Sequence, residues 1–313
     1  MGPCPNDIVS SKSLSTTTTI LSEIKKQQVI SSAGKTDLTY SHKYVWRNII
    51  FMLYAHLGAF YGLYLLLTEA KMVLLFEILY GYLSLIGVTG GTHRLWSHRS
   101  YKAKFPLRVL LMIFQTAAFQ NHIYEWSRDH RVHHKFSETD GDPHNAKRGF
   151  FFCHMGWLMV KKHPDVLNKG KRIDMSDLEK DPVVVFQRKY YPVLMPLLAF
   201  ILPTLIPIYV WNTDPWTAWY GTLFRWVITV NGTWCVNSFA HLWGSRPYNT
   251  PIFNLTARFI DFFAKFGWAY DLKVVSEETI KRRILRTGRR KHIRKRKTIW
   301  GWVTRTCDDS SPL

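Results

Sequence analysis

The sequence predicts an all-α integral membrane protein, in which four transmembrane helices are capped by a cytosolic helical domain. Long apolar runs alternate with strongly basic segments, the pattern of a polytopic membrane protein. Lysine and arginine outnumber the acidic residues, 42 against 22, and gather in segments that would all face one side of the membrane. Three groups of histidines would face that same side. The mean hydropathy of −0.12 resembles that of a soluble protein because it averages these unlike parts.

The chain begins with residues 1–44, which are rich in Ser, Thr and Lys and lack the apolar core of a signal peptide. This composition predicts a disordered cytosolic leader. The cysteines are scattered and form no CxxC pair, so neither a disulfide framework nor a zinc knuckle is expected. They fit a reducing environment that faces the cytosol.

Four apolar runs follow, each long enough to cross a membrane. The predicted spans are residues 49–68, 72–90, 191–211 and 216–236. The first run would measure roughly 30 Å as a helix, which is the hydrocarbon thickness of a bilayer. Very short turns at 69–71 and 212–215 join the runs in pairs, which predicts two transmembrane hairpins.

The polar segments between and after the spans are predicted to build the cap, from residues 91–190 and 242–288. Within the first of these, residues 105–123 are apolar but interrupted by polar side chains, which favours an interfacial or half-inserted helix. Residues 253–270 form an amphipathic aromatic stretch. Residues 289–313 are a basic tail that we expect to touch anionic lipid or to be solvated, since no nucleic-acid-binding module accompanies it.

The distribution of positive charge predicts the orientation. The leader end, the 91–190 segment and the C-terminal tail carry nearly all the cations, whereas the two short turns carry only Lys71. Cytosolic segments of membrane proteins are enriched in Lys and Arg. Both termini and the long loop are therefore predicted to face the cytosol, as are all three histidine groups.

The central motif is His130, His133 and His134, at positions i, i+3 and i+4 of a predicted helix. Such positions share one helix face, so three imidazoles could converge on one metal ion. The alternative is a set of interfacial polar residues, which three histidines within five positions make less plausible. Because no thiolate accompanies them, the pattern indicates a transition-metal centre rather than structural zinc.

Two further histidine groups flank this motif. His93 and His98 are about 140° apart on an ideal α-helix and could converge only if the helix ended just beyond Gly90 and Gly91. A basic juxtamembrane cap is the alternative interpretation. Asn237 and His241, also i and i+4, stand at the exit of the fourth span, where such a pair is by itself more often a cap or an interfacial contact.

Three stretches carry a specific resemblance: HRLWSHRSYKA (93–103), EWSRDHRVHHKFSETDGDPHNAKRGFFFCHMGW (125–157) and NGTWCVNSFAHLWGSRPY (231–248). They resemble the membrane acyl-CoA desaturases of the stearoyl-CoA type, which are Δ9-like fatty acid desaturases. The resemblance covers residues 45–288, which are predicted to form one domain.

The resemblance implies a di-iron centre that uses O2, and electrons from cytochrome b5 with its reductase, to insert a cis double bond into a fatty acyl-CoA at the endoplasmic reticulum membrane. The implied iron ligands are His93, His98, His130, His133, His134 and His241, with Asn237 acting through a water. His144, His154 and His163 stand at positions that the family does not use as ligands.

The implied substrate contacts, at the CoA headgroup or the entrance for the acyl chain, are Asn48, Asn121, Arg128, Asp129, Lys161, Lys162 and Trp234. Lysine and arginine complement the phosphate charges of CoA. For Lys161 and Lys162 a solvated basic loop remains an open alternative.

The sequence departs from the family pattern at one place. The family carries a third box of the HNYHH type after the stretch that matches 246–248, whereas here the chain runs directly into a stretch that matches from Phe253. The resemblance therefore implies that three ligands are missing, which would weaken at least one iron site. Three hypotheses follow: an active desaturase, an inactive isoform that binds acyl-CoA or partners other desaturases, and a different histidine-box oxygenase such as a hydroxylase.

Two ionisable residues, Glu77 and Arg225, fall inside predicted spans. Charged groups at that depth are costly, and they are usually paired or functional.

Overall fold

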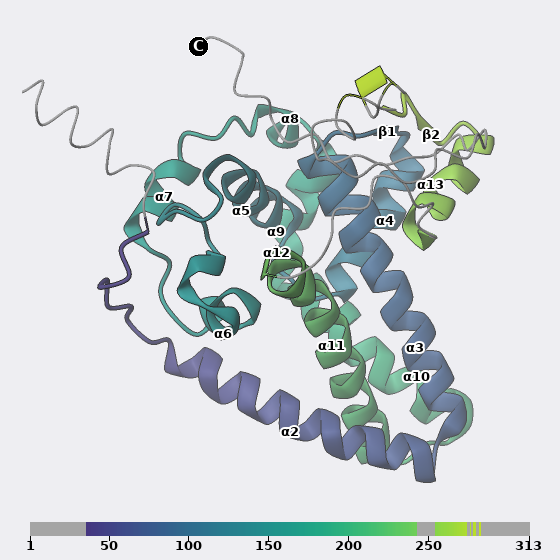
Figure 1. Ribbon diagram of the computed structural model, residues 1–313. Helices are drawn as coiled ribbons and strands as arrows, with labels where there is room; N and C mark the ends of the chain where they lie inside the picture. Colours follow the sequence, from purple (N-terminus) through teal and green to yellow (C-terminus); the bar gives the residue numbers. More distant parts are fainter. Residues whose placement is uncertain (1–35, 243–253, 274–275, 277, 280–281, 283–313) are drawn as a thin grey trace, which may run out of the picture.

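The computed structural model describes residues 36–242, 254–273, 276, 278, 279 and 282 (Figure 1). Most of the predicted leader, the basic tail and the junction at 246–253 lie outside these residues. Figure 1 shows α2, α3, α10 and α11 meeting at one end of the molecule, with α5, α6, α7, α8 and α13 at the other.

Three helices are long and apolar enough to cross a membrane: Trp46–Thr68, Lys71–Ser97 and Pro182–Trp211. The first is α2. The second consists of α3 (Lys71–Ile86) and the π-helix η1 (Gly87–Ser97). The third consists of α9 (Pro182–Pro196), the π-helix η4 (Leu197–Ile201) and α10 (Leu202–Trp211). The predicted spans 49–68, 72–90 and 191–211 lie inside these helices.

The fourth predicted span is also a helix, α11 (Pro215–Asn237), and its 23 residues have the length to cross a membrane. It is not among the three apolar helices because it carries polar side chains such as Thr222, Arg225 and Thr229. These side chains are buried within the bundle, so α11 presents them to protein rather than to lipid. Its role as a span stays a prediction.

The contact between α2 and α11 depends on Gly62. A Cβ atom at this position would lie 2.1 Å from the backbone oxygen of Tyr220, so only glycine allows the two backbones to approach this closely. The carbonyl belongs to a helix and cannot turn away. Gly232, further along α11, has no atom within 4 Å of the equivalent position.

Replacing Gly62 with alanine is therefore expected to lower the free energy of unfolding by about 1–3 kcal/mol, because the two helices must separate. Thermal unfolding in detergent measures the change. Gly232→Ala is the matched control on the partner helix and should not destabilise the protein. Equal melting temperatures for the two variants would contradict this account of the contact.

The cap is built from short elements around α4 (Phe105–Ala117) and α5 (Ile123–Phe136). The remaining elements are β1 (Lys102–Ala103), η2 (Ala146–Arg148), α6 (Phe150–His154), η3 (Gly156–Leu158), α7 (Pro164–Gly170), α8 (Ser176–Glu179), α12 (Phe239–Leu242), α13 (Leu255–Lys265) and β2 (Ala269–Tyr270). Strands β1 and β2 pair antiparallel. Leu107, Leu111, Ile123, Leu178 and Ile260 are buried in the core that joins these helices.

The predicted single helix over 105–123 is wrong, because α4 ends at Ala117 and α5 begins at Ile123. Phe119 and Asn121 between them adopt left-handed conformations, with φ of 49° and 66°, which no α-helix can contain. Gln187 of α9 fixes this break, since it accepts a hydrogen bond from the Ile123 N–H and donates to Gln115. The polar interruptions in the run therefore serve packing within the cap.

Candidate metal centre

His93 and His98 come together because their segment is a π-helix. In η1 the N–H of His98 donates to the carbonyl of His93, 3.0 Å away, which is the i to i+5 bond of that helix type. The wider turn brings residues five apart onto the same side, and the two ring centroids are 4.5 Å apart. The expected helix end beyond Gly90 and Gly91 is wrong, because η1 continues to Ser97.

Helix α5 brings His130 and His134 to the same point. Its N-terminus is capped by His122, whose ring nitrogen accepts from the Glu125 N–H, and the Glu125 carboxylate in the first turn complements the helix dipole. The Nε2 atom of His130 lies 3.0 Å from Nε2 of both His98 and His134.

Four imidazoles thus form one cluster, the four-histidine cluster, made of His93, His98, His130 and His134, whose ligand nitrogens all lie within 4.8 Å of one another. Two nitrogens bound at a right angle to a shared ion at roughly 2.1 Å would be about 3.0 Å apart. The observed spacing fits this requirement. The donor set, imidazoles without thiolate, suits iron and other transition metals.

The cluster is neutral at pH 7 and therefore able to bind a cation. Burial lowers the pKa of His98 and of His134 to about 4, with help from nearby cationic groups. The pKa of His130 lies well below the ordinary value for the same reason, since burial and the neighbouring imidazoles both disfavour its charged form. Metal ligation requires this unprotonated state.

The three histidines of α5 do not converge on one point, which corrects the prediction from their spacing. His133 instead joins Asp142 and His144, whose ligand atoms lie within 4.8 Å of one another, in what we call the His133 cluster. The ring of His241 lies 5.0 Å from that of His133. Residues at i+3 and i+4 are about 100° apart around the helix, enough to direct neighbouring side chains to two sites. Helix α5 therefore lies between two groups of ligands.

Asp142 orients His133. Its carboxylate accepts from Nδ1 of His133 at 2.8 Å and from the backbone N–H groups of Glu138 and His144. Burial alone would raise the pKa of Asp142, but the bond from His133 and the other donors hold it below its ordinary value. A carboxylate that binds one ring nitrogen leaves the other free for a metal, the usual arrangement around histidine ligands.

Asp142 and His144 were not predicted as site residues. His144 is buried, and burial lowers its pKa to about 3. The resemblance gave His144 no role as a ligand, because the family does not use that position. The loop after α5 nevertheless brings its ring into contact with the ring of His133, and the two ring centroids are 4.3 Å apart. The only signal in the sequence was the acid and histidine of Asp142-Pro-His144 following the central motif.

These pKa shifts predict how the metal-free protein responds to acid. The unfolded histidines take up protons near pH 6.5, whereas His98, His134 and His144 resist protonation until about pH 4 or 3. The unfolded chain therefore binds more protons in that window, so stability is present above pH 6.5 and is lost as the pH falls from 6.5 to 4. The melting temperature of chelator-treated protein should drop over this range, and less so in His144→Gln. A flat profile would contradict the buried, neutral cluster.

A cavity of about 310 Å³ adjoins the four-histidine cluster, with His130 and His144 in its lining. Part of its wall is aromatic: Phe51 and Phe119 pack against Trp226, with ring centroids 5.2 and 5.5 Å from it. An aromatic wall of this kind accepts a hydrocarbon chain.

Five predicted residues line this same cavity: Asn48, Asn121, Asp129, Trp234 and Asn237. Asn48 is held by a hydrogen bond from its side chain to the carbonyl of Leu158. The fold thus brings together residues that are far apart in the chain and places them in one cavity with His130 of the four-histidine cluster.

The three predicted basic contacts are absent from the lining of this cavity and differ from one another. Arg128 and Lys162 both bind the carboxylates of Glu125 and Asp129, which neutralise their charge. Burial alone would lower the pKa of Lys162, but these carboxylates raise it above its ordinary value. Lys161 is exposed, and it lines a separate narrow crevice together with Lys162.

Comparison with known proteins identifies one family. The model of the fatty acid desaturase family matches residues 69–264. The chain is 52% identical over 309 residues to an acyl-CoA Delta-9 desaturase of Acheta domesticus, with 86% of this chain and 85% of that protein covered. It is 44% identical to an acyl-CoA Delta(11) desaturase of Trichoplusia ni, with 96% and 95% covered. It is 49% identical to a stearoyl-CoA desaturase of Sus scrofa, with 79% of each covered.

Each alignment is longer than the part of this chain that it covers. The alignment with the Acheta protein has 309 positions, whereas 86% of 313 residues is about 269, a difference of about 40. For the Sus scrofa protein, 283 positions compare with about 247 residues, a difference of about 36. About 36–40 positions of each alignment therefore have no counterpart in this chain.

Proposed function

The chain belongs to the fatty acid desaturase family, and from that premise we propose that it binds a saturated fatty acyl-CoA and holds iron for the O2-dependent insertion of a cis double bond. By family it is an oxidoreductase that acts on fatty acyl-CoA, since its relatives are named acyl-CoA desaturases. One observation carries the proposal: the ligand nitrogens of four imidazoles lie within 4.8 Å of one another, and one of these residues, His130, lines the adjoining cavity.

The proposed first iron site is the four-histidine cluster. The second is built on His133 and His241, with Asn237 reaching the metal through a water. Asp142 and His144 complete its surroundings, because Asp142 fixes the ring of His133. When bound, iron supplies the activation of O2 and the electron transfer that removal of hydrogen from a CH2 group requires.

The protein's own contribution is to orient the acyl chain and to exclude water. The aromatic side chains of Phe51, Phe119 and Trp226 would hold the chain. Because His130 also lines the cavity, its position would determine which carbon atoms of the chain lie nearest the metal. Trp126 stacks on His130, with ring centroids 4.8 Å apart, and so shields it from solvent. A rigid, dry site of this kind favours one reacting position over its neighbours.

The CoA headgroup is proposed to lie at the cavity mouth, near Asn48, Asn121 and Asp129. Lys161 is the better candidate for a phosphate contact than Lys162. Its side chain is exposed, whereas Lys162 is already paired with two carboxylates.

The cytosolic side of the endoplasmic reticulum membrane is the proposed location of the cap and both termini, with cytochrome b5 and its reductase as electron donor. Three apolar helices support a multi-pass membrane protein. The concentration of Lys and Arg outside the short turns supports the orientation.

A second candidate function is a catalytically inactive member that binds acyl-CoA or partners other desaturases. The absence of an HNYHH-type box between Tyr248 and Phe253 favours it, as do the roughly 36–40 alignment positions without a counterpart in this chain. Fewer ligands weaken a metal site.

Iron content and product formation separate the two functions. The purified full-length chain, reconstituted with cytochrome b5 and its reductase, is given stearoyl-CoA and palmitoyl-CoA. About two irons per chain with a monounsaturated product would support the active enzyme. About one iron or less without product, rescued when the missing box is inserted, would support the inactive member. A chain that binds neither iron nor acyl-CoA would overturn the proposal.

A further inference from the structure

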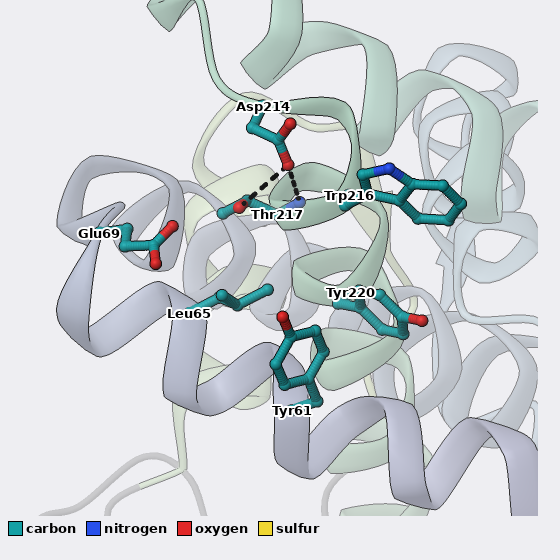
Figure 2. A pocket seen from close by; sticks show the side chains of 7 residues that line it. All are labelled: Tyr61, Leu65, Glu69, Asp214, Trp216, Thr217 and Tyr220. Carbon is teal, nitrogen blue, oxygen red and sulfur yellow. Dashed lines mark hydrogen bonds between the residues drawn. The ribbon is translucent and has the colours of Figure 1, made fainter.

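A second hollow is lined by residues that include Tyr61, Glu69 and Asp214 (Figure 2). Its volume is about 470 Å³, and it opens between the last turns of α2 and the first turns of α11. Glu69 precedes the helix Lys71–Ser97, whereas His98 follows it, so the hollow and the metal centre lie at the two ends of one membrane-capable helix. The hollow therefore faces the far membrane interface.

Aromatic rings form much of its lining. Tyr61 and Tyr220 meet edge to face with ring centroids 5.0 Å apart, and Trp216 stacks alongside Tyr220 at 6.4 Å. Tyr61 and Trp216 are 50% and 68% exposed, so their faces are open to a ligand. Tyr61 stands seven residues before Thr68, the end of α2, which is roughly 10 Å along the helix axis.

Two carboxylates share the hollow with these rings. Asp214 caps α11 and accepts from the N–H and hydroxyl of Thr217 through one oxygen. Glu69 is exposed, and within the described part of the chain no hydrogen bond or ion pair of its side chain occurs. Figure 2 shows Glu69 and Tyr61 on one side of the hollow and Asp214, Trp216 and Tyr220 on the other. The hollow is acidic on a chain whose formal net charge is +20.

Aromatic faces combined with carboxylates recognise cations. The negative face of a tyrosine or tryptophan ring attracts a quaternary ammonium group, and a nearby carboxylate balances its charge. A primary ammonium pairs with the same carboxylates, but it is more strongly hydrated than a trimethylammonium group, so open ring faces favour the trimethylammonium group. At a membrane interface, the quaternary ammonium group is the choline of a phospholipid.

We propose that this hollow binds the choline headgroup of phosphatidylcholine, with Tyr61, Tyr220 and Trp216 around the trimethylammonium group and Glu69 and Asp214 balancing its charge. Lys71, two residues after Glu69, supplies a cation for the phosphate of the same lipid. The acyl chains would lie along the exposed apolar side chains of α2. The site would anchor one lipid at the end of the bundle remote from the metal, and it does not depend on the proposed enzymatic function.

Native mass spectrometry of the full-length protein tests the proposal. The protein in mild detergent is mixed with equal amounts of phosphatidylcholine, phosphatidylethanolamine and phosphatidylglycerol of identical acyl chains. We expect one phosphatidylcholine to be retained at least about three-fold more often than either other lipid. Glu69→Gln and Tyr61→Leu should each reduce that preference by about three-fold or more.

The controls are matched in chemistry and lie outside the hollow. Tyr209→Leu removes a tyrosine that is 82% exposed on α10, and Glu278→Gln removes an exposed carboxylate at the other end of the chain. Both should leave the preference unchanged, and all variants should melt like the parent. Equal retention of the three lipids would overturn the proposal, as would equal losses in the hollow variants and the controls. Such results would instead identify the rings as part of a general interfacial aromatic belt.

Discussion

Replacing His130 with alanine is expected to remove most of the iron from the four-histidine cluster, lowering affinity by at least about 10- to 100-fold. His130 is the central ligand, because its Nε2 is 3.0 Å from those of both His98 and His134. The cavity left by its ring would also release Trp126, which stacks on it. Iron content after dialysis against a weak chelator measures the change.

His163→Asn is the matched control. His163 is a cap residue, since its ring nitrogen accepts from the Asp165 N–H at the start of α7, and asparagine preserves a capping acceptor. Iron content should therefore remain that of the parent. His144→Ala should leave the four-histidine cluster filled and reduce only the iron bound near His133. If His130→Ala retained the parent's iron, the cluster would not be a metal site.

Breaking the ion pair of Glu77 and Arg225 is expected to give the largest loss of stability. The two side chains are almost fully buried between α3 and α11, with Arg225 Nε 3.1 Å from the Glu77 carboxylate. Arg225 also donates to the carbonyls of Ala117 and Ala199. The Ala117 carbonyl lacks an ordinary helical partner because Ala117 ends α4. One side chain thereby satisfies groups from three other elements.

Arg225→Leu should therefore cost about 3–5 kcal/mol, because it leaves the Glu77 carboxylate buried without a counter-charge. The double variant Glu77→Leu/Arg225→Leu should be more stable than Arg225→Leu alone, since it removes that charge. Equilibrium unfolding in mixed micelles provides the comparison.

The control is Arg282→Leu, which breaks a pair of residues that are both largely exposed and should change stability by less than about 1 kcal/mol. If the double variant were as unstable as the sum of its single variants, Glu77 and Arg225 would not act as a pair.

The sequence predicted the apolar helices because their hydrophobic runs have the length of a bilayer, a signal that is local and strong. It could identify Glu77 and Arg225 as costly residues inside spans, but it could not pair them. Their contact depends on how α3 and α11 pack, and no local pattern encodes that packing.

The sequence identified the histidines of the four-histidine cluster but not their arrangement, and it missed Asp142 and His144. Spacing rules assume an α-helix, whereas His93 and His98 meet only because η1 is a π-helix. The same rules grouped His133 with its neighbours on α5, although the loop that carries Asp142 and His144 draws it into a second cluster. Loop paths of this kind depend on tertiary contacts, so residues contributed by loops were the ones missed.

An anomalous difference map at the iron edge, from crystals of the iron-loaded protein, tests the central claim most directly. We expect a peak at metal–ligand distance from the imidazole nitrogens of His93, His98, His130 and His134, with any second peak beside His133 and His241. A map with no peak among those four rings, or iron bound only elsewhere on the chain, would contradict it.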